Sequence, residues 1–113
     1  MSVEVRAVAK DSRISPQKAR LVADQVRGLP VDRALAVLAL SPKKAARLLE
    51  KVLQSAIANA EQNHGLDVDE LLVASARVDA GMKMRRFRPT GRGRTRRRIK
   101  RSSHLSVTVR ERS

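Results

Sequence analysis

The chain of 113 residues contains no cysteine, no tryptophan and no tyrosine, and it has one phenylalanine, Phe87. The absence of cysteine excludes a disulfide framework, a thiolate metal site and a thiol nucleophile, and it is compatible with a reducing cytosol. The near absence of aromatic rings removes the surfaces on which recognition-motif and oligonucleotide-binding folds stack unpaired bases. We therefore expect neither thiol chemistry nor the reading of single-stranded nucleic acid.

Long apolar runs are absent as well. No stretch approaches the roughly 18 apolar residues that a transmembrane helix requires. The first residues, Met1 to Ala9, alternate apolar and polar side chains and lack the continuous apolar segment of a secretory signal. We expect a cytoplasmic protein with no membrane partner, folded as a single domain over residues 1–113.

Groups suited to catalysis are sparse. The two histidines, His64 and His104, have no motif of acidic residues around them. Asp67, Asp69 and Glu70 form a short acidic cluster that lacks the further spaced ligands of a calcium loop. We predict that the protein is not an enzyme and that it uses no cofactor and no metal.

Positive charge is what the chain has in abundance. Its 25 Lys and Arg against 11 Asp and Glu give a net charge of +14, with a pI of about 11.7. Nucleic-acid-binding domains are typically basic beyond a pI of about 9. Eleven of the basic residues and no acid lie between Lys83 and Arg101. The partner is therefore predicted to be a polyanion, and this segment is its main point of attachment.

Three segments alternate apolar and polar residues with the period of two that is typical of half-buried strands. The first lies near the N-terminus, and the other two lie on either side of the basic segment. The alternating apolar residues are Val3, Val5, Ala7 and Ala9; Leu72, Ala74, Ala76 and Val78; and Leu105, Val107 and Val109.

Three helices are predicted between the first two strands from apolar residues at helical spacing. A Ser-Pro pair at 15–16 and another at 41–42 are expected to supply an N-cap hydroxyl and a proline at the first helical position. Gly28 and Gly65 are expected to end the first and third helices. The apolar faces comprise Ala19, Val22, Ala23 and Val26; Val31, Ala34, Leu35 and Leu38; and Leu48, Leu49, Val52, Leu53, Ala56, Ile57 and Ala60.

The basic segment joins two strands by a connection far longer than the usual two to five residues of a hairpin. If its arms are extended at about 3.3 Å per residue, its tip lies roughly 30 Å beyond the body. The predicted fold class is α+β, a small antiparallel three-stranded sheet packed against three helices, with a long extended β-hairpin loop at about residues 82–101.

Folded RNA is the preferred partner, because guanidinium groups match phosphate oxygens and an extended arm suits the crevices of structured RNA. A second basic group precedes and begins the first helix, for which an ordinary solvated surface is an equally good interpretation. The candidate RNA-binding residues are Lys10, Arg13, Lys18, Arg20, Lys83, Arg85, Arg86, Arg88, Arg92, Arg94, Arg96, Arg97, Arg98, Lys100 and Arg101. Two alternatives remain open: a free RNA chaperone or regulator, and a DNA-binding architectural protein whose arm enters the minor groove.

Several runs of residues along the chain form a recognisable pattern. The runs are Ser15 to Asp24 with Arg27 and Gly28; Ser55 to Glu61 with Asn63; Val78, Asp79 and Gly81; Gly93 and Arg94; and Lys100 to Val109. In this order they resemble bacterial ribosomal protein L22, and the resemblance covers essentially the whole sequence. The chain departs from the family pattern at Ala80 and Met82, where relatives often have Glu and Pro, and at Thr90, where Arg is common.

The resemblance implies a structural protein of the large ribosomal subunit that binds 23S ribosomal RNA and acts during assembly. It implies that the hairpin lines the nascent-peptide exit tunnel, so that other large-subunit proteins and the nascent peptide are further partners, and no homo-oligomer is expected. The tunnel-facing tip implied by this resemblance comprises Arg85, Arg86, Phe87, Arg88, Pro89, Thr90, Gly91, Arg92, Gly93 and Arg94.

Overall fold

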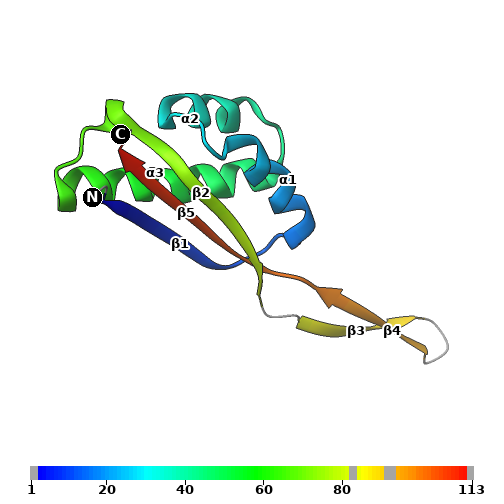
Figure 1. Ribbon diagram of the computed structural model, residues 1–113. Helices are drawn as coiled ribbons and strands as arrows, with labels where there is room; N and C mark the ends of the chain where they lie inside the picture. The colour runs from blue at the N-terminus through cyan, green and yellow to red at the C-terminus, as the bar shows by residue number, and fades with distance from the viewer. Residues whose placement is uncertain (1–2, 82–83, 91–93, 112–113) are drawn as a thin grey trace.

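The computed structural model describes residues 3–81, 84–90 and 94–111, and for residues 84–90 and 94–100 it describes the backbone alone. Two parts are visible in Figure 1: a body of helices and sheet, and a narrow hairpin that extends away from one end of it. The molecule measures 64 × 25 × 18 Å, and its radius of gyration is 17.1 Å. A compact domain of this length has a radius of gyration of about 13 Å. The hairpin therefore gives the protein its elongated shape.

The sheet of the body has three antiparallel strands in the order β1 (Glu4–Ser12), β5 (Ser103–Glu111) and β2 (Leu71–Ala80). The last strand of the chain thus lies in the middle, and it joins the two strands that the sequence places far apart. Alternate residues of β5 are buried, namely Ser103, Leu105, Val107 and Val109. The helices cover this face of the sheet, as Figure 1 shows.

The helices are α1 (Pro16–Val26), α2 (Val31–Leu40) and α3 (Lys44–His64), and a short 3-10 helix, η1 (Val68–Glu70), precedes β2. The predicted apolar faces are confirmed: every such residue of α1 is buried, and Leu35, Leu48 and Ile57 are the partly buried members of the other two helices. Gly65 ends α3 in the left-handed conformation with φ 64°, as expected for a C-terminal glycine. The predicted α+β class is therefore confirmed.

The prediction that serine hydroxyls cap the first and third helices is wrong. Ser15 stands at the N-cap of α1, but its hydroxyl makes no capping hydrogen bond. Ser41 instead ends α2, and α3 begins only at Lys44, after Lys43 as its N-cap. The Ser41 hydroxyl oxygen accepts a 3.4 Å hydrogen bond from the backbone N–H of Lys43, which is a local turn rather than a helix cap.

The predicted alternation of β2 is correct only in its second half. Ala76 and Val78 are buried as expected, but in the first half Leu71 and Val73 are the buried residues. The pairing of β2 with β5 shifts register between Val73 and Ser75, and an extra residue at such an irregularity changes which face the following residues occupy. Similarly, Val3 precedes β1 and is 44% exposed.

The hairpin is a second, two-stranded sheet of β3 (Met84–Thr90) and β4 (Arg94–Lys100). Its strands pair antiparallel from Met84 opposite Lys100 to Thr90 opposite Arg94. The long connection between β2 and β5 is thus an extended ribbon, in agreement with the predicted hairpin.

Candidate nucleic-acid interface

Five of the candidate RNA-binding residues lie in the body or at the root of the hairpin, and all five are exposed. They come from the end of β1, the β1–α1 connection, the start of α1 and the start of the β4–β5 connection. The fold brings these segments to the end of the body from which the hairpin departs (Figure 1). The residues are Lys10, Arg13, Lys18, Arg20 and Arg101.

A groove of about 400 Å³ lies between the start of α1 and the root of the hairpin. Arg20 and Arg101 both line it, although 80 residues of sequence separate them, and the other lining residues are small or polar: Pro16, Gln17, Ala80, Gly81 and Ser102. Two guanidinium groups at one concave surface form a suitable environment for a phosphate group. Both arginines are candidate RNA-binding residues from the sequence, and the fold places them in one site.

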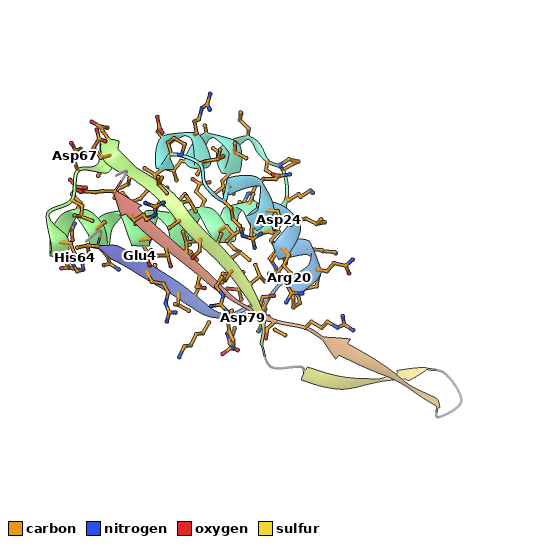
Figure 2. All side chains as sticks on the ribbon, viewed as in Figure 1. Glu4, Arg20, Asp24, His64, Asp67 and Asp79 are labelled. Atoms are coloured by element: carbon orange, nitrogen blue, oxygen red, sulfur yellow. The ribbon has the colours of Figure 1, made fainter. Side chains whose placement is uncertain are left out.

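Arg20 is held in place by the backbone of β2. Its Nε and Nη2 atoms donate hydrogen bonds of 3.2 and 3.1 Å to the carbonyl oxygen of Val78. Because a carbonyl oxygen is neutral, this contact orients the guanidinium group and leaves its positive charge uncompensated. Figure 2 shows Arg20 at the hairpin end of the body, near the end of β2.

Arg27, seven residues after Arg20 and at the C-cap of α1, has a different role. Its Nε atom donates a 2.9 Å hydrogen bond to the carbonyl oxygen of Ala76, and its Nη1 atom forms an ion pair with Asp24. Of the two arginines that could pair with Asp24, the fold therefore selects Arg27. Together Arg20 and Arg27 attach α1 to β2, so α1 presents a fixed surface beside the hairpin root.

The hairpin root is closed by backbone contacts that leave little space. The backbone N–H of Gly81 donates a 2.9 Å hydrogen bond to the carbonyl oxygen of Ser102. A Cβ atom at position 81 would lie 2.6 Å from Ser102 Oγ and 3.3 Å from two backbone atoms of Ser102. Next to it, the buried Ser103 Oγ donates a 2.7 Å hydrogen bond to the carbonyl oxygen of Ile14. These contacts set the direction in which the hairpin leaves the body.

We expect Gly81→Ala to weaken RNA binding by about fivefold to twentyfold, with a loss of stability of about 1–3 kcal/mol, because the added methyl group overfills the root and displaces Ser102. The measurement is RNA affinity by filter binding, together with urea unfolding. Ser102→Gly removes the closest atom, so the double variant Gly81→Ala, Ser102→Gly should recover most of the affinity. An unchanged affinity in the single variant would show that the root does not direct the hairpin.

The remaining basic candidates lie on the hairpin. Lys83 and Arg92, together with the predicted tip residues Gly91 and Gly93, lie outside the described residues. The strand register places Arg86 opposite Arg98 and Arg88 opposite Arg96. Like charges directly opposite each other destabilise a strand pair, so a ribbon of this composition is stabilised by a polyanion that neutralises them.

The opposite end of the body is acidic. The backbone N–H of Asp67 donates a 3.4 Å hydrogen bond to Glu111 Oε1, which brings the start of η1 to the end of β5. Figure 2 labels Glu4, His64 and Asp67 at this end, away from Arg20 and Asp79 at the hairpin end. The acidic residues of the elements that meet here are Glu4, Glu61, Asp67, Asp69, Glu70 and Glu111. Asp11 and Asp79 lie at the hairpin end, but cations outnumber them there, so this charge distribution favours an orientation with the hairpin end toward a polyanion.

His104 and Asp67 are engaged in local contacts. His104 Nδ1 accepts a 3.1 Å hydrogen bond from the backbone N–H of Asp11, and Asp67 Oδ1 accepts a 3.0 Å hydrogen bond from the N–H of Asp69. On the exposed surface near the end of α3, Asn63 Nδ2 donates a 3.4 Å hydrogen bond to Asn59 Oδ1. Within residues 3–81 and 101–111, no group of three or more His, Cys, Asp and Glu is arranged to hold a metal ion.

Four further cations at the start of α3 were not among the candidates. Lys44 Nζ donates a 3.0 Å hydrogen bond to the carbonyl oxygen of Arg13, which places the start of α3 beside the β1–α1 connection. The sequence signal that could have found them is a helix whose first turn holds no acid. The four residues, Lys43, Lys44, Arg47 and Lys51, are all exposed.

A comparison with protein families identifies the fold. The family model for ribosomal protein L22p/L17e matches residues 7–110. This range contains most of the body, Arg20 and Arg27, and the basic segment between β2 and β5. The chain belongs to the ribosomal protein L22p/L17e family. Its members are proteins of the large ribosomal subunit, which act in translation as structural, RNA-binding components. In the described part of this family member, no helix is long and apolar enough to cross a membrane.

Proposed function

We propose that this L22-family protein binds 23S ribosomal RNA, joins several of its domains during assembly, and lines the nascent-peptide exit tunnel with its hairpin. One observation carries the RNA part of the proposal. Cations from segments far apart in the sequence gather at the hairpin end of the body, continuous with a hairpin that holds most of the net charge. The tunnel part rests on family membership.

The division of roles follows from the two parts of the molecule. The groove with Arg20 and Arg101 and the neighbouring Lys10, Arg13 and Lys18 contact RNA at the surface of the subunit. The hairpin enters the RNA, and the residues around its tip, from Arg85 to Arg94, face the tunnel and the nascent peptide. The protein acts as a monomer on the cytoplasmic ribosome, and its side chains contribute charge and shape rather than catalysis.

The test is a competition experiment at fixed salt concentration. We expect transcribed large-subunit ribosomal RNA to compete for the protein at least about a hundredfold better than duplex DNA of equal nucleotide concentration, because specific sites exceed non-specific ones by about 10³ or more. Equal competition would exclude the RNA preference and would favour the architectural DNA-binding alternative.

Sedimentation separates a ribosomal component from a free RNA chaperone. The tagged protein in a cell extract is expected to travel with large subunits through a salt wash of moderate strength, because contacts distributed over a groove and a long hairpin dissociate slowly. A protein that remains at the top of the gradient while binding RNA in isolation would support the chaperone alternative.

A further inference from the structure

The first turns of α3 present a row of cations that neither the groove nor the hairpin uses. Lys44, Arg47 and Lys51 are spaced by three and four residues, so they follow one side of the helix. Leu49, Val52, Leu53 and Ala56, which are buried, follow the other side. The row therefore lies on the exposed side of α3, and it is continued at the helix start by the exposed Lys43.

The row is joined to the RNA-binding end of the molecule. Lys44 Nζ is bonded to the carbonyl oxygen of Arg13, and the next residue, Ile14, accepts the hydrogen bond from Ser103 at the hairpin root. A single short connection thus contacts both the start of α3 and the root of the hairpin. We call the surface formed by Lys43, Lys44, Arg47 and Lys51 the α3 patch.

Within the part of the chain that the structure describes, no acidic side chain is paired with the cations of this patch. Among the described residues, the side chains of Lys43, Arg47 and Lys51 have no hydrogen-bond or ion-pair partner. Glu50 is the nearest acid along the helix, and its carboxylate accepts a 3.4 Å hydrogen bond from Gln54. Cations on one helix side repel one another, so a bound polyanion would stabilise this arrangement.

The position of the patch also opposes the stability of α3. The first turn of a helix is the positive end of its dipole, where acids stabilise and cations destabilise. In α3 that turn has no acid, and Lys43 and Lys44 stand at its start. A purely structural helix gains nothing from this arrangement, whereas a surface for an anionic partner does.

We propose that the α3 patch binds the sugar-phosphate backbone of a second RNA segment, distinct from the RNA that the groove and hairpin contact. This inference rests on the proposed RNA-binding function and extends it to residues of α3. Phosphate is favoured over an acidic protein because the exposed side chains of the patch are all cationic and offer no aromatic or large apolar anchor for a protein interface. The α3 patch of the body then binds one RNA segment, while the groove and the hairpin bind another.

The test uses the full-length chain with the triple variant Lys43→Gln, Arg47→Gln, Lys51→Gln, which leaves the Lys44 bond to Arg13 intact. A matched control, Arg6→Gln, Arg33→Gln, Arg110→Gln, removes the same charge from exposed or half-buried positions elsewhere. Affinity for transcribed large-subunit ribosomal RNA is measured as a function of salt. Each lost phosphate contact lowers the slope of log K against log salt by about 0.7–0.9.

We expect the slope of the α3 variant to fall by about 2, and its affinity at low salt to fall at least about tenfold, while the control slope falls by less than about 1. We also expect the free α3 variant to melt at or above the temperature of the unmodified protein, since cations have left the positive end of a helix. A lower melting temperature with the loss of affinity would indicate a structural role and overturn the proposal.

Two other results would also decide against the patch. An α3 variant that binds RNA like the control, while Arg96→Gln, Arg97→Gln, Arg98→Gln loses affinity, leaves the proposed function intact and removes the second RNA contact. An α3 variant that binds RNA normally but fails to enter large subunits identifies a protein contact in place of the second RNA contact. If the hairpin triple variant also binds normally, the proposed function itself fails.

Discussion

Replacing residues 82–101 by Asn-Gly is expected to reduce the affinity for large-subunit ribosomal RNA by about a thousandfold or more, toward the level of non-specific binding. The replacement removes the hairpin and all eleven of its basic residues. Counterion release from the phosphates that they contact drives the association, so the salt dependence should flatten together with the affinity. Filter binding at several salt concentrations measures both quantities.

The shortened protein is expected to remain folded, because the hairpin is a separate two-stranded sheet and the core lies in the body. Gly81 and Ser102 are already bonded across the cut, and Asn-Gly is the preferred two-residue hairpin turn. Circular dichroism and a thermal melt check this expectation. An unfolded product would show that the hairpin is part of the fold, and a folded product with unchanged RNA affinity would exclude the hairpin as the main attachment.

The second large effect concerns stability. Leu49→Ala is expected to lower the free energy of unfolding by about 2–5 kcal/mol, since it removes buried methyl groups and leaves a cavity. Leu49 is fully buried in α3, the helix that packs against β1, β5 and α2 together. A weaker attachment of α3 therefore loosens both the sheet and the surface on which the basic residues are displayed. Urea unfolding followed by circular dichroism measures the change.

The matched control is Leu40→Ala, which makes the same truncation at a residue that is 86% exposed at the end of α2. Its expected effect is within about 0.5 kcal/mol, because it removes almost no buried area. Similar losses in the two variants would mean that the packing of α3 on the sheet is not the main source of stability.

Local patterns were enough to predict the helices and their buried faces. The helical period of Ala19, Val22, Ala23 and Val26 and the glycine at position 65 depend on neighbours within a few residues, and both predictions are confirmed. The caps were predicted less well, because a serine hydroxyl can bond to several nearby backbone groups. Ser41 bonds to the N–H of Lys43 in a turn, and the hydroxyl of Ser15 leaves the first turn of α1 uncapped.

Which residues of β2 are buried could be decided only from its pairing with the neighbouring strand β5. Read alone, Leu72 and Ala74 continue the alternation of Ala76 and Val78, but the register shift against β5 buries Leu71 and Val73 instead. An irregularity of this kind is set by pairing with residues more than thirty positions away, so alternation within one strand does not reveal it.

The sequence by itself determined that the protein is basic, that its charge is concentrated between Lys83 and Arg101, and that its apolar residues form the strands and helices of an α+β fold. These are properties of composition and local period. Only the tertiary structure decided that Arg20 and Arg101 share a groove, that Arg27 rather than Arg20 pairs with Asp24, and that Lys44 bonds to Arg13. The reason is that each of these contacts depends on how separate elements pack, which a one-dimensional pattern of charges does not contain.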